Sequence, residues 1–146
     1  MGFQLLSELA AQNTSVLETN AFDSENLPLP LVFTEEAKSS RLWGSAPPSI
    51  ISIFANQDVT INLHHDGVAP DTYTSNAKLN ANVKLLSTNV DRKNKPFGSS
   101  LEGKNFPFYG VQFHPERNVV SKHIGKTELT ERTVRMEFKG SCYAYC

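Results

Sequence analysis

A short aromatic and β-branched segment that stops at a proline constrains this sequence most. Residues 106–113 have the composition of a buried strand. Pro115 lacks a backbone donor, so the strand cannot continue through it. His114 is thereby placed at the carboxyl end of a strand, where open α/β sheets form their ligand sites. Glu116, two residues further on, can turn back toward the imidazole.

This pair of side chains indicates acid–base chemistry. A carboxylate that binds one nitrogen of a histidine holds its tautomer and leaves the other nitrogen to act as a base. His114 and Glu116 would then be two members of a nucleophilic triad. A histidine and a glutamate at this spacing are also common as a strand end beside a solvated carboxylate, so the surrounding sequence must decide.

The rest of the chain predicts short helices alternating with short strands. This pattern is typical of an α/β protein with a largely parallel sheet. The first helix is expected to bury Phe3, Leu5, Leu6, Leu9 and Ala10. Helices are expected at 3–12, at 49–55, and from Glu35 to about Trp43 after an N-cap at Thr34. Strands are expected at 59–63, 83–88 and 133–138. Residues 27–33 are expected to form an extended edge segment, and 98–105 a polar turn.

The charge balance excludes some classes of partner. The chain has 14 basic and 15 acidic residues, which argues against a nucleic-acid or membrane partner recruited by charge. No run of about eighteen apolar residues predicts a transmembrane helix. Residues 1–11 lack a basic region and contain Glu8, so we expect no signal peptide in this chain. Asn13-Thr14-Ser15 is a glycosylation sequon, which has meaning only in a secreted protein.

The two cysteines do not predict a site. Cys142 and Cys146 lie four residues apart near the end of the sequence. They could form a metal or redox pair, but we interpret them as two unrelated thiols. No metal site is predicted.

Residues 102–117 resemble the histidine motif of γ-glutamyl hydrolases, which are cysteine hydrolases of the class I glutamine amidotransferase type. The core, Gln112 to Glu116, is shared with many class I amidotransferases, whereas the preceding 106–111 is more particular to hydrolases of folate polyglutamates. Further resemblance lies at 29–34, 40–42 and 85–91.

The resemblance covers roughly residues 1–117 and implies the fold. It implies a flavodoxin-like, parallel-sheet sandwich of the class I glutamine amidotransferase type, of which this chain would hold only the second half. Residues 1–117 would be the C-terminal part of a γ-glutamyl hydrolase catalytic domain. Residues 118–146 match no continuation of the family and are expected to form a divergent tail of unknown role.

The resemblance also assigns roles to particular residues. His114 would act as base and then as acid, and Glu116 would hold it. His64 follows the strand at 59–63 and is similar to a family histidine expected to bind or position substrate, with His65 as the second choice. In the family the nucleophile stands in Gly-Thr-Cys-x-Gly-Phe. Met1-Gly2-Phe3 matches the end of that motif, so the cysteine is expected just before Met1, and the Met1 backbone nitrogen in the oxyanion hole.

An intact family member would remove γ-linked glutamates from folylpoly-γ-glutamates without a cofactor. It would be lysosomal, vacuolar or extracellular, and a homodimer is left open. The chain as written is predicted to be inactive because it lacks the nucleophile. Two alternatives remain: a catalytically dead protein that binds polyglutamates or a partner, and the glutaminase half of another class I amidotransferase.

Overall fold

Six strands in two sheets, with five α-helices around them, make up the described part of the chain. The structure is a computed structural model and describes residues 2–117. The helices are α1 (Gly2–Ala11), α2 (Glu35–Lys38), α3 (Pro48–Asn56), α4 (Pro70–Ser75) and α5 (Ala77–Asn82), with a 3₁₀ turn η1 (Thr14–Val16). The strands are β1 (Ser24–Leu29), β2 (Val32–Phe33), β3 (Thr60–His64), β4 (Val83–Val90), β5 (Pro96–Gly103) and β6 (Tyr109–Val111).

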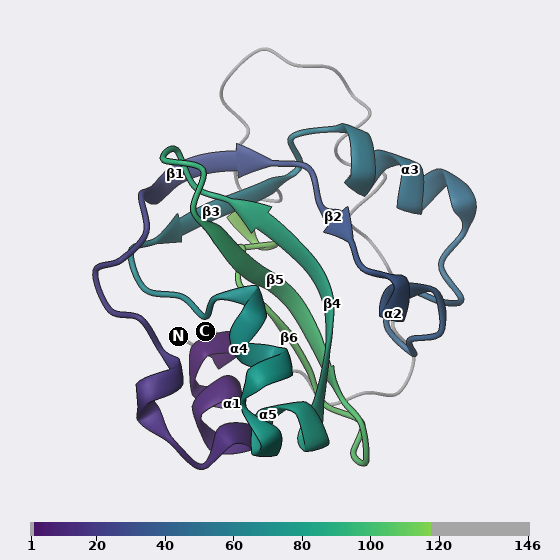
Figure 1. The fold of residues 1–146 in the computed structure, drawn as a ribbon. Helices are drawn as coiled ribbons and strands as arrows, with labels where there is room; N and C mark the ends of the chain where they lie inside the picture. The colour runs from purple at the N-terminus through teal and green to yellow at the C-terminus, as the bar shows by residue number, and fades with distance from the viewer. Residues whose placement is uncertain (1, 118–146) are drawn as a thin grey trace.

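The strands pair in a different sense from the one expected. The larger sheet has the order β2-β4-β5-β6, β1 pairs with β3, and every pairing between these strands is antiparallel (Figure 1). Residues 91–95 join β4 to β5, and 104–108 join β5 to β6. Connections this short permit only antiparallel neighbours, since a parallel pair needs a crossover of about a dozen residues or more. The mixed α/β composition is confirmed, but the parallel pairing is not found among these strands.

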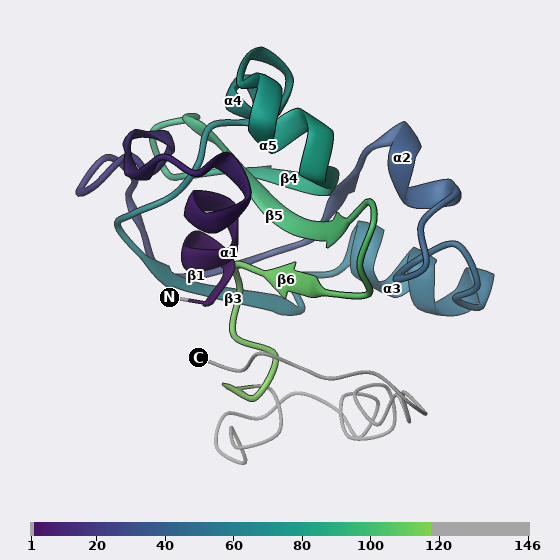
Figure 2. The ribbon, with the colours of Figure 1, turned by 90° about the horizontal axis from the view of Figure 1, so that it is seen from below.

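Two hydrophobic clusters flank the β4–β5 hairpin. Neighbouring residues of a strand point to opposite faces, and accordingly Leu85 packs against one cluster and Leu86 belongs to the other. The first cluster joins α1, α4 and α5 to the sheet (Figure 2) and contains Phe3, Ala11, Val16, Val68, Tyr73, Leu79, Val83 and Leu101. The second lies under α2 and α3 and contains Leu31, Ala37, Trp43, Leu86 and Phe113.

The polar turn predicted at 98–105 is wrong, because most of this segment belongs to the buried strand β5. Its polar side chains have buried partners. Ser99 Oγ donates to Asn89 Oδ1 at 2.5 Å, and Ser100 Oγ lies 2.6 Å from Ser87 Oγ. A polar group can be buried at little cost when it is hydrogen-bonded, so polarity here did not mean exposure. Strand β6 is shorter than the predicted 106–113 and covers 109–111.

The buried face of α1 also differs from the expected one. The helix itself is confirmed at Gly2–Ala11, but Leu5 is 54% exposed and Leu9 is 63% exposed. Gln4 and Ser7 are buried in their place. Ser7 Oγ donates to the Phe3 carbonyl at 3.0 Å, and Gln4 reaches a loop beyond β3. Side-chain hydrogen bonds therefore allow the more polar face of this helix to turn inward.

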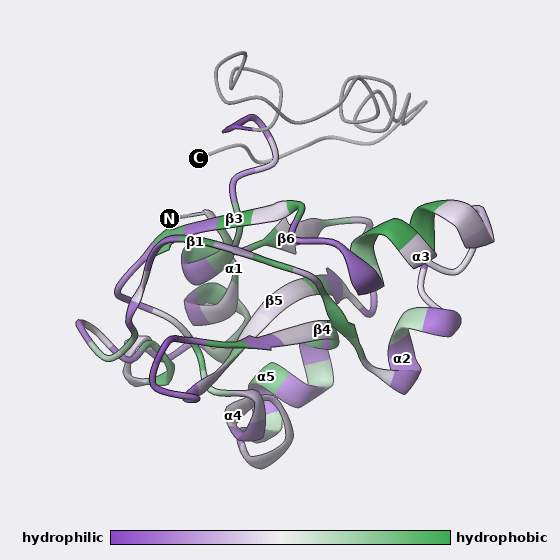
Figure 3. Cartoon of the chain, turned by 90° about the horizontal axis from the view of Figure 1, so that it is seen from above, coloured by the Kyte–Doolittle hydropathy of each residue, from purple (hydrophilic) through white to green (hydrophobic). Residues whose placement is uncertain are grey.

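The remaining helices agree in part with the sequence. Helix α3 at Pro48–Asn56 confirms the helix expected at 49–55 with one more residue at each end. It is strongly apolar in Figure 3, yet none of its residues is fully buried. Helix α2 ends at Lys38 rather than near Trp43, and the hydroxyl of Thr34 donates to the Leu85 carbonyl instead of capping the helix. Helices α4 and α5 were not predicted. No helix within residues 2–117 is both long and apolar enough to cross a bilayer.

Asp91 organises the turn between β4 and β5. Its carboxylate accepts hydrogen bonds from the backbone N–H groups of Asp23, Lys93 and Lys95, each at 2.8 Å. Burial by itself raises the pKa of Asp91, but the three donors together outweigh burial and hold the pKa below the usual 3.8. The ionised carboxylate thus ties the hairpin to the segment that precedes β1.

Glu102 fastens the loop after α2 to β5. This glutamate is 3% exposed, and its Oε2 accepts the backbone N–H groups of Arg41 at 2.8 Å and Leu42 at 3.2 Å. The Arg41 guanidinium donates to the carbonyls of Gly103 and Phe106 and so holds the β5–β6 turn as well. The loop and the hairpin are therefore held as one unit.

We predict that Glu102→Leu lowers the free energy of unfolding by up to roughly 2–6 kcal/mol, because it leaves two partly buried N–H donors without an acceptor, at about 1–3 kcal/mol each when fully buried. Glu102→Gln keeps an acceptor oxygen of the same shape and should cost clearly less. Urea denaturation of both variants measures the difference. Equal losses in the two variants would contradict the role of the acceptor.

Candidate functional site

His114 and Glu116 form a hydrogen-bonded pair, as the sequence predicted. Nδ1 of His114 lies 2.7 Å from Oε1 of Glu116, with side chains 29% and 50% exposed respectively. Burial raises the pKa of Glu116, but the hydrogen bond to His114 and the charges of His114 and Arg117 bring it below the usual 4.5. An ionised Glu116 accepts from Nδ1–H and leaves Nε2 of His114 for proton transfer.

Backbone hydrogen bonds carry this pair from the larger sheet to β3. After β6, the Gln112 N–H donates to the Ser99 carbonyl at 2.9 Å, and the His114 N–H donates to the Ile61 carbonyl at 2.9 Å. Figure 2 shows the segment that follows β6 running past β3. Because β3 ends at His64, the two predicted histidines belong to adjacent segments of the same region.

His64 is buried and neutral. Its Nδ1 lies 2.9 Å from the Asp66 carbonyl, which can only accept, so Nδ1 carries the proton. The ring meets Phe97 edge-on, with 4.8 Å between ring centroids. Burial lowers the pKa of His64 to about 4, the hydrogen bond to Asp66 opposes this, and the charges of His114 and His65 add to it. Within the described residues Nε2 is buried without a hydrogen-bond partner, so His64 presents an unpaired acceptor.

The first turn of α1 is bonded to the same carbonyl. Nε2 of Gln4 donates to the Asp66 carbonyl at 3.0 Å, beside the bond from His64. One oxygen therefore couples the start of α1 to the orientation of His64. Sequence patterns did not single out Gln4, because an amide in a helix that also contains Ser7 and Glu8 is a weak signal.

The other sequence candidates lie elsewhere. Adjacent strand residues face opposite ways, and His65, at 56% side-chain exposure, points away from the buried position of His64. Its Nδ1 lies 3.1 Å from the Phe22 carbonyl and its Nε2 3.9 Å from the Glu25 carboxylate. Met1 and both cysteines lie outside the described residues.

No group of three or more His, Cys, Asp or Glu side chains in residues 2–117 is arranged to hold a metal ion.

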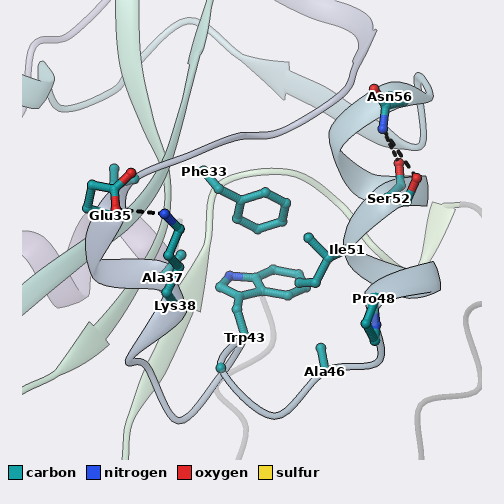
Figure 4. A pocket seen from close by; sticks show the side chains of 12 residues that line it. Phe33, Glu35, Ala37, Lys38, Trp43, Ala46, Pro48, Ile51, Ser52 and Asn56 are labelled. Atoms are coloured by element: carbon teal, nitrogen blue, oxygen red, sulfur yellow. Dashed lines mark hydrogen bonds and ion pairs between the residues drawn. The ribbon is translucent and has the colours of Figure 1, made fainter.

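A cleft of about 540 Å³ opens between α2, the loop after it and α3 (Figure 4). Phe33, Trp43 and Ile51 form its apolar wall, and the exposed Lys38–Glu35 ion pair lies at its edge. His64, His114 and Glu116 do not line this cleft, so it is separate from the histidine site.

The arrangement combines two histidines in different electrostatic states. His114, paired with a carboxylate and partly exposed, is suited to take up and release a proton. His64, desolvated and with its proton fixed on Nδ1, can only accept a hydrogen bond at Nε2. Such a site fits general acid–base catalysis next to a hydrogen-bonding position for a substrate.

Known proteins show similarity over most of the chain. No family model matches the sequence. The chain is 35% identical over 121 residues to γ-glutamyl hydrolase B of Dictyostelium discoideum. These residues cover 83% of this chain and 34% of the relative. It is 33% identical to γ-glutamyl hydrolase of Mus musculus over 94% of this chain and 43% of the relative. With the γ-glutamyl hydrolase of Homo sapiens it shares 33% identity over 80% of this chain and 36% of the relative. The chain thus spans between a third and a half of the length of these relatives.

We predict that His64 makes folding sensitive to mild acid. The unfolded chain binds a proton near pH 6.5, whereas folded His64 does so only near pH 4. The contribution of neutral His64 to the free energy of unfolding is therefore complete above pH 6.5. It declines as the pH falls toward 4, by up to roughly 3 kcal/mol at about 1.4 kcal/mol per pKa unit. Urea unfolding at pH 7 and pH 5 measures the loss.

The matched variants are His64→Gln, which should remove this part of the pH dependence, and His65→Gln, which should leave it in place. An NMR titration in which the His64 ring protonates near pH 6.5 would contradict the prediction.

Proposed function

We propose that this chain, which belongs to the γ-glutamyl hydrolase family, forms the part of such an enzyme that carries the general base. The whole protein would hydrolyse γ-glutamyl amide bonds. The observation that carries this proposal is the 2.7 Å hydrogen bond between His114 and Glu116 at the position of the family's histidine motif.

In the proposed reaction a cysteine thiol is the nucleophile. Nε2 of His114 takes the thiol proton, and the thiolate attacks the γ-carbonyl carbon. The same nitrogen then gives the proton to the leaving amine, and a thioester remains. His114 then takes a proton from water, which attacks the thioester carbonyl; the C–S bond breaks and the cysteine sulfur recovers the proton. The acyl portion leaves as a carboxylate, which is glutamate for a γ-glutamyl peptide and the shortened chain for a folylpolyglutamate. Glu116 stays ionised and stabilises the imidazolium throughout.

The cysteine would stand immediately before Met1 in the longer protein, as the match of Met1-Gly2-Phe3 to the family motif suggests. Helix α1 begins at Gly2. The positive end of its dipole and its first N–H groups would therefore face the position where the oxyanion forms. The Met1 backbone nitrogen is proposed as one oxyanion donor.

His64 would help to bind or position substrate, and a direct contact would require its Nε2, which is buried among the described residues, to become accessible. Since this ring is neutral at pH 7, it cannot act as a cation toward the carboxylates of a polyglutamate chain. It can accept a hydrogen bond from an N–H or O–H group, such as the scissile amide. Gln4 would hold it in place through the shared Asp66 carbonyl.

We propose folylpoly-γ-glutamates as the substrates, on the strength of the residues at 106–111 that resemble hydrolases of this class. The same resemblance suggests a lysosomal, vacuolar or extracellular location and leaves a homodimer open. No cofactor is needed for the proposed steps.

One observation favours a second candidate, a protein that binds polyglutamates without cleaving them. Residues 2–117 contain no cysteine, so no thiol from the described part of the chain lies beside the His114–Glu116 pair. Release of glutamate from a γ-glutamyl peptide would support the hydrolase, and binding of that peptide without release would support the alternative. Release of ammonia from glutamine would instead indicate the glutaminase half of another amidotransferase.

In the longest form of the protein isolated from cells, we predict that His114→Asn lowers kcat/KM for a γ-glutamyl peptide by about 10²–10⁴-fold, because the general base is lost. Glu116→Gln should lower kcat less and leave KM nearly unchanged, because the amide oxygen can still accept from Nδ1–H. Steady-state kinetics of glutamate release measure both effects.

Two variants serve as matched controls, His65→Asn and Glu36→Gln. Both are surface residues outside the pair and should keep full activity. Undiminished hydrolysis by His114→Asn would sink the proposed mechanism.

A further inference from the structure

The turn after α1 presents the glycosylation sequon at the surface. Helix α1 ends at Ala11, and Gln12 follows with φ of 51°, a left-handed conformation that turns the chain sharply. Asn13, Thr14 and Ser15 are all exposed. No other Asn-X-Ser/Thr triplet occurs in the sequence.

The local conformation leaves the reactive atom of Asn13 unengaged. Its backbone is extended, with φ −159° and ψ 122°, and its Oδ1 accepts the Ser15 backbone N–H at 2.9 Å. This Asx turn uses the amide oxygen. Within the described residues no hydrogen bond is made by Nδ2, the atom to which an N-linked sugar is attached.

The sequon lies at the opposite end of α1 from the histidine site. A ten-residue helix is about 15 Å long, and the site is coupled to its first turn through Gln4. The sequon end instead adjoins α5, where Gln12 binds Lys78 at 2.7 Å and Asn82 binds the Ala10 carbonyl at 2.9 Å (Figure 1). A glycan at this end would leave His114 and Glu116 uncovered.

We propose that Asn13 carries an N-linked glycan. A bond forms between Nδ2 and the anomeric carbon of an oligosaccharide on a lipid diphosphate donor. The anomeric C–O bond to the diphosphate breaks, and the amide proton passes to a base of the transferase. This inference rests on the secreted, lysosomal or vacuolar route given with the proposed function, because the transfer takes place on that route.

The test uses the native protein captured by antibody from the cells that make it. Peptide-N-glycosidase in H₂¹⁸O converts a glycosylated asparagine to ¹⁸O-labelled aspartate, and Glu-specific protease then releases residues 9–18, in which Asn13 is the only asparagine. The expected result is ¹⁸O-labelled aspartate in place of Asn13 in this peptide, detected by mass spectrometry. If protein that has not been treated with the glycosidase yields this peptide with Asn13 unmodified throughout, the proposal is overturned.

Two variants expressed in the same cells make the result specific. Ser15→Ala removes the sequon hydroxyl and keeps Asn13, so the label should disappear. Ser15→Thr keeps the sequon, so the label should remain. A label that persists in Ser15→Ala also overturns the proposal.

Glutamate release from a γ-glutamyl peptide is measured in the same preparations. The ¹⁸O label at Asn13 without hydrolysis supports the glycan and counts against the proposed function. Hydrolysis with bare Asn13 overturns the glycan alone. Ser15→Ala should keep the activity of the parent protein, since the sequon is remote from the site.

Discussion

The buried polar side chains of β5 hold the rest of this structure in position. Ser99 binds Asn89, which in turn binds the Pro30 carbonyl, and Ser100 joins Ser87 to the indole N–H of Trp43. Glu102 fixes the loop after α2. The two serine bonds to Asn89 and Ser87 join the adjacent strands β4 and β5, and the other bonds reach segments 57 to 61 residues away. Such satisfied networks specify one arrangement of a core. The Ser99 carbonyl also receives Gln112, and this bond sets the path that leads to His114.

Two histidines acquire different properties from their surroundings. His114 is partly exposed and has a carboxylate partner, so it can exchange a proton. His64 is buried against Phe97 with its proton fixed toward Asp66, so it stays neutral. The different surroundings of the two rings allow an acid–base role and a positioning role to be assigned within one site.

Buried polar atoms without a partner are concentrated near this site. Within the described residues they are Ser24 Oγ, Asn62 Oδ1, His64 Nε2 and Gln112 Oε1. Ser24 pairs directly with His64 across the β1–β3 sheet, and Asn62 is two residues before it on the same strand face. Gln112 is two residues before His114. Unpaired buried groups each cost about 1–3 kcal/mol, and proteins tend to retain such local conflicts at functional sites.

The sequence by itself determined the features that depend on neighbours along the chain. His114 and Glu116 form their contact because only Pro115 stands between them in the chain. Helices α1 and α3 and strands β3 and β4 follow from local patterns of apolar residues. The tertiary structure decided the rest. Whether β5 is buried, whether His64 or His65 faces inward, and whether Gln4 touches the site all depend on partners tens of residues away. Polarity in a short segment cannot reveal such partners, because a hydrogen bond inside the fold replaces the water that the sequence alone would lead one to expect.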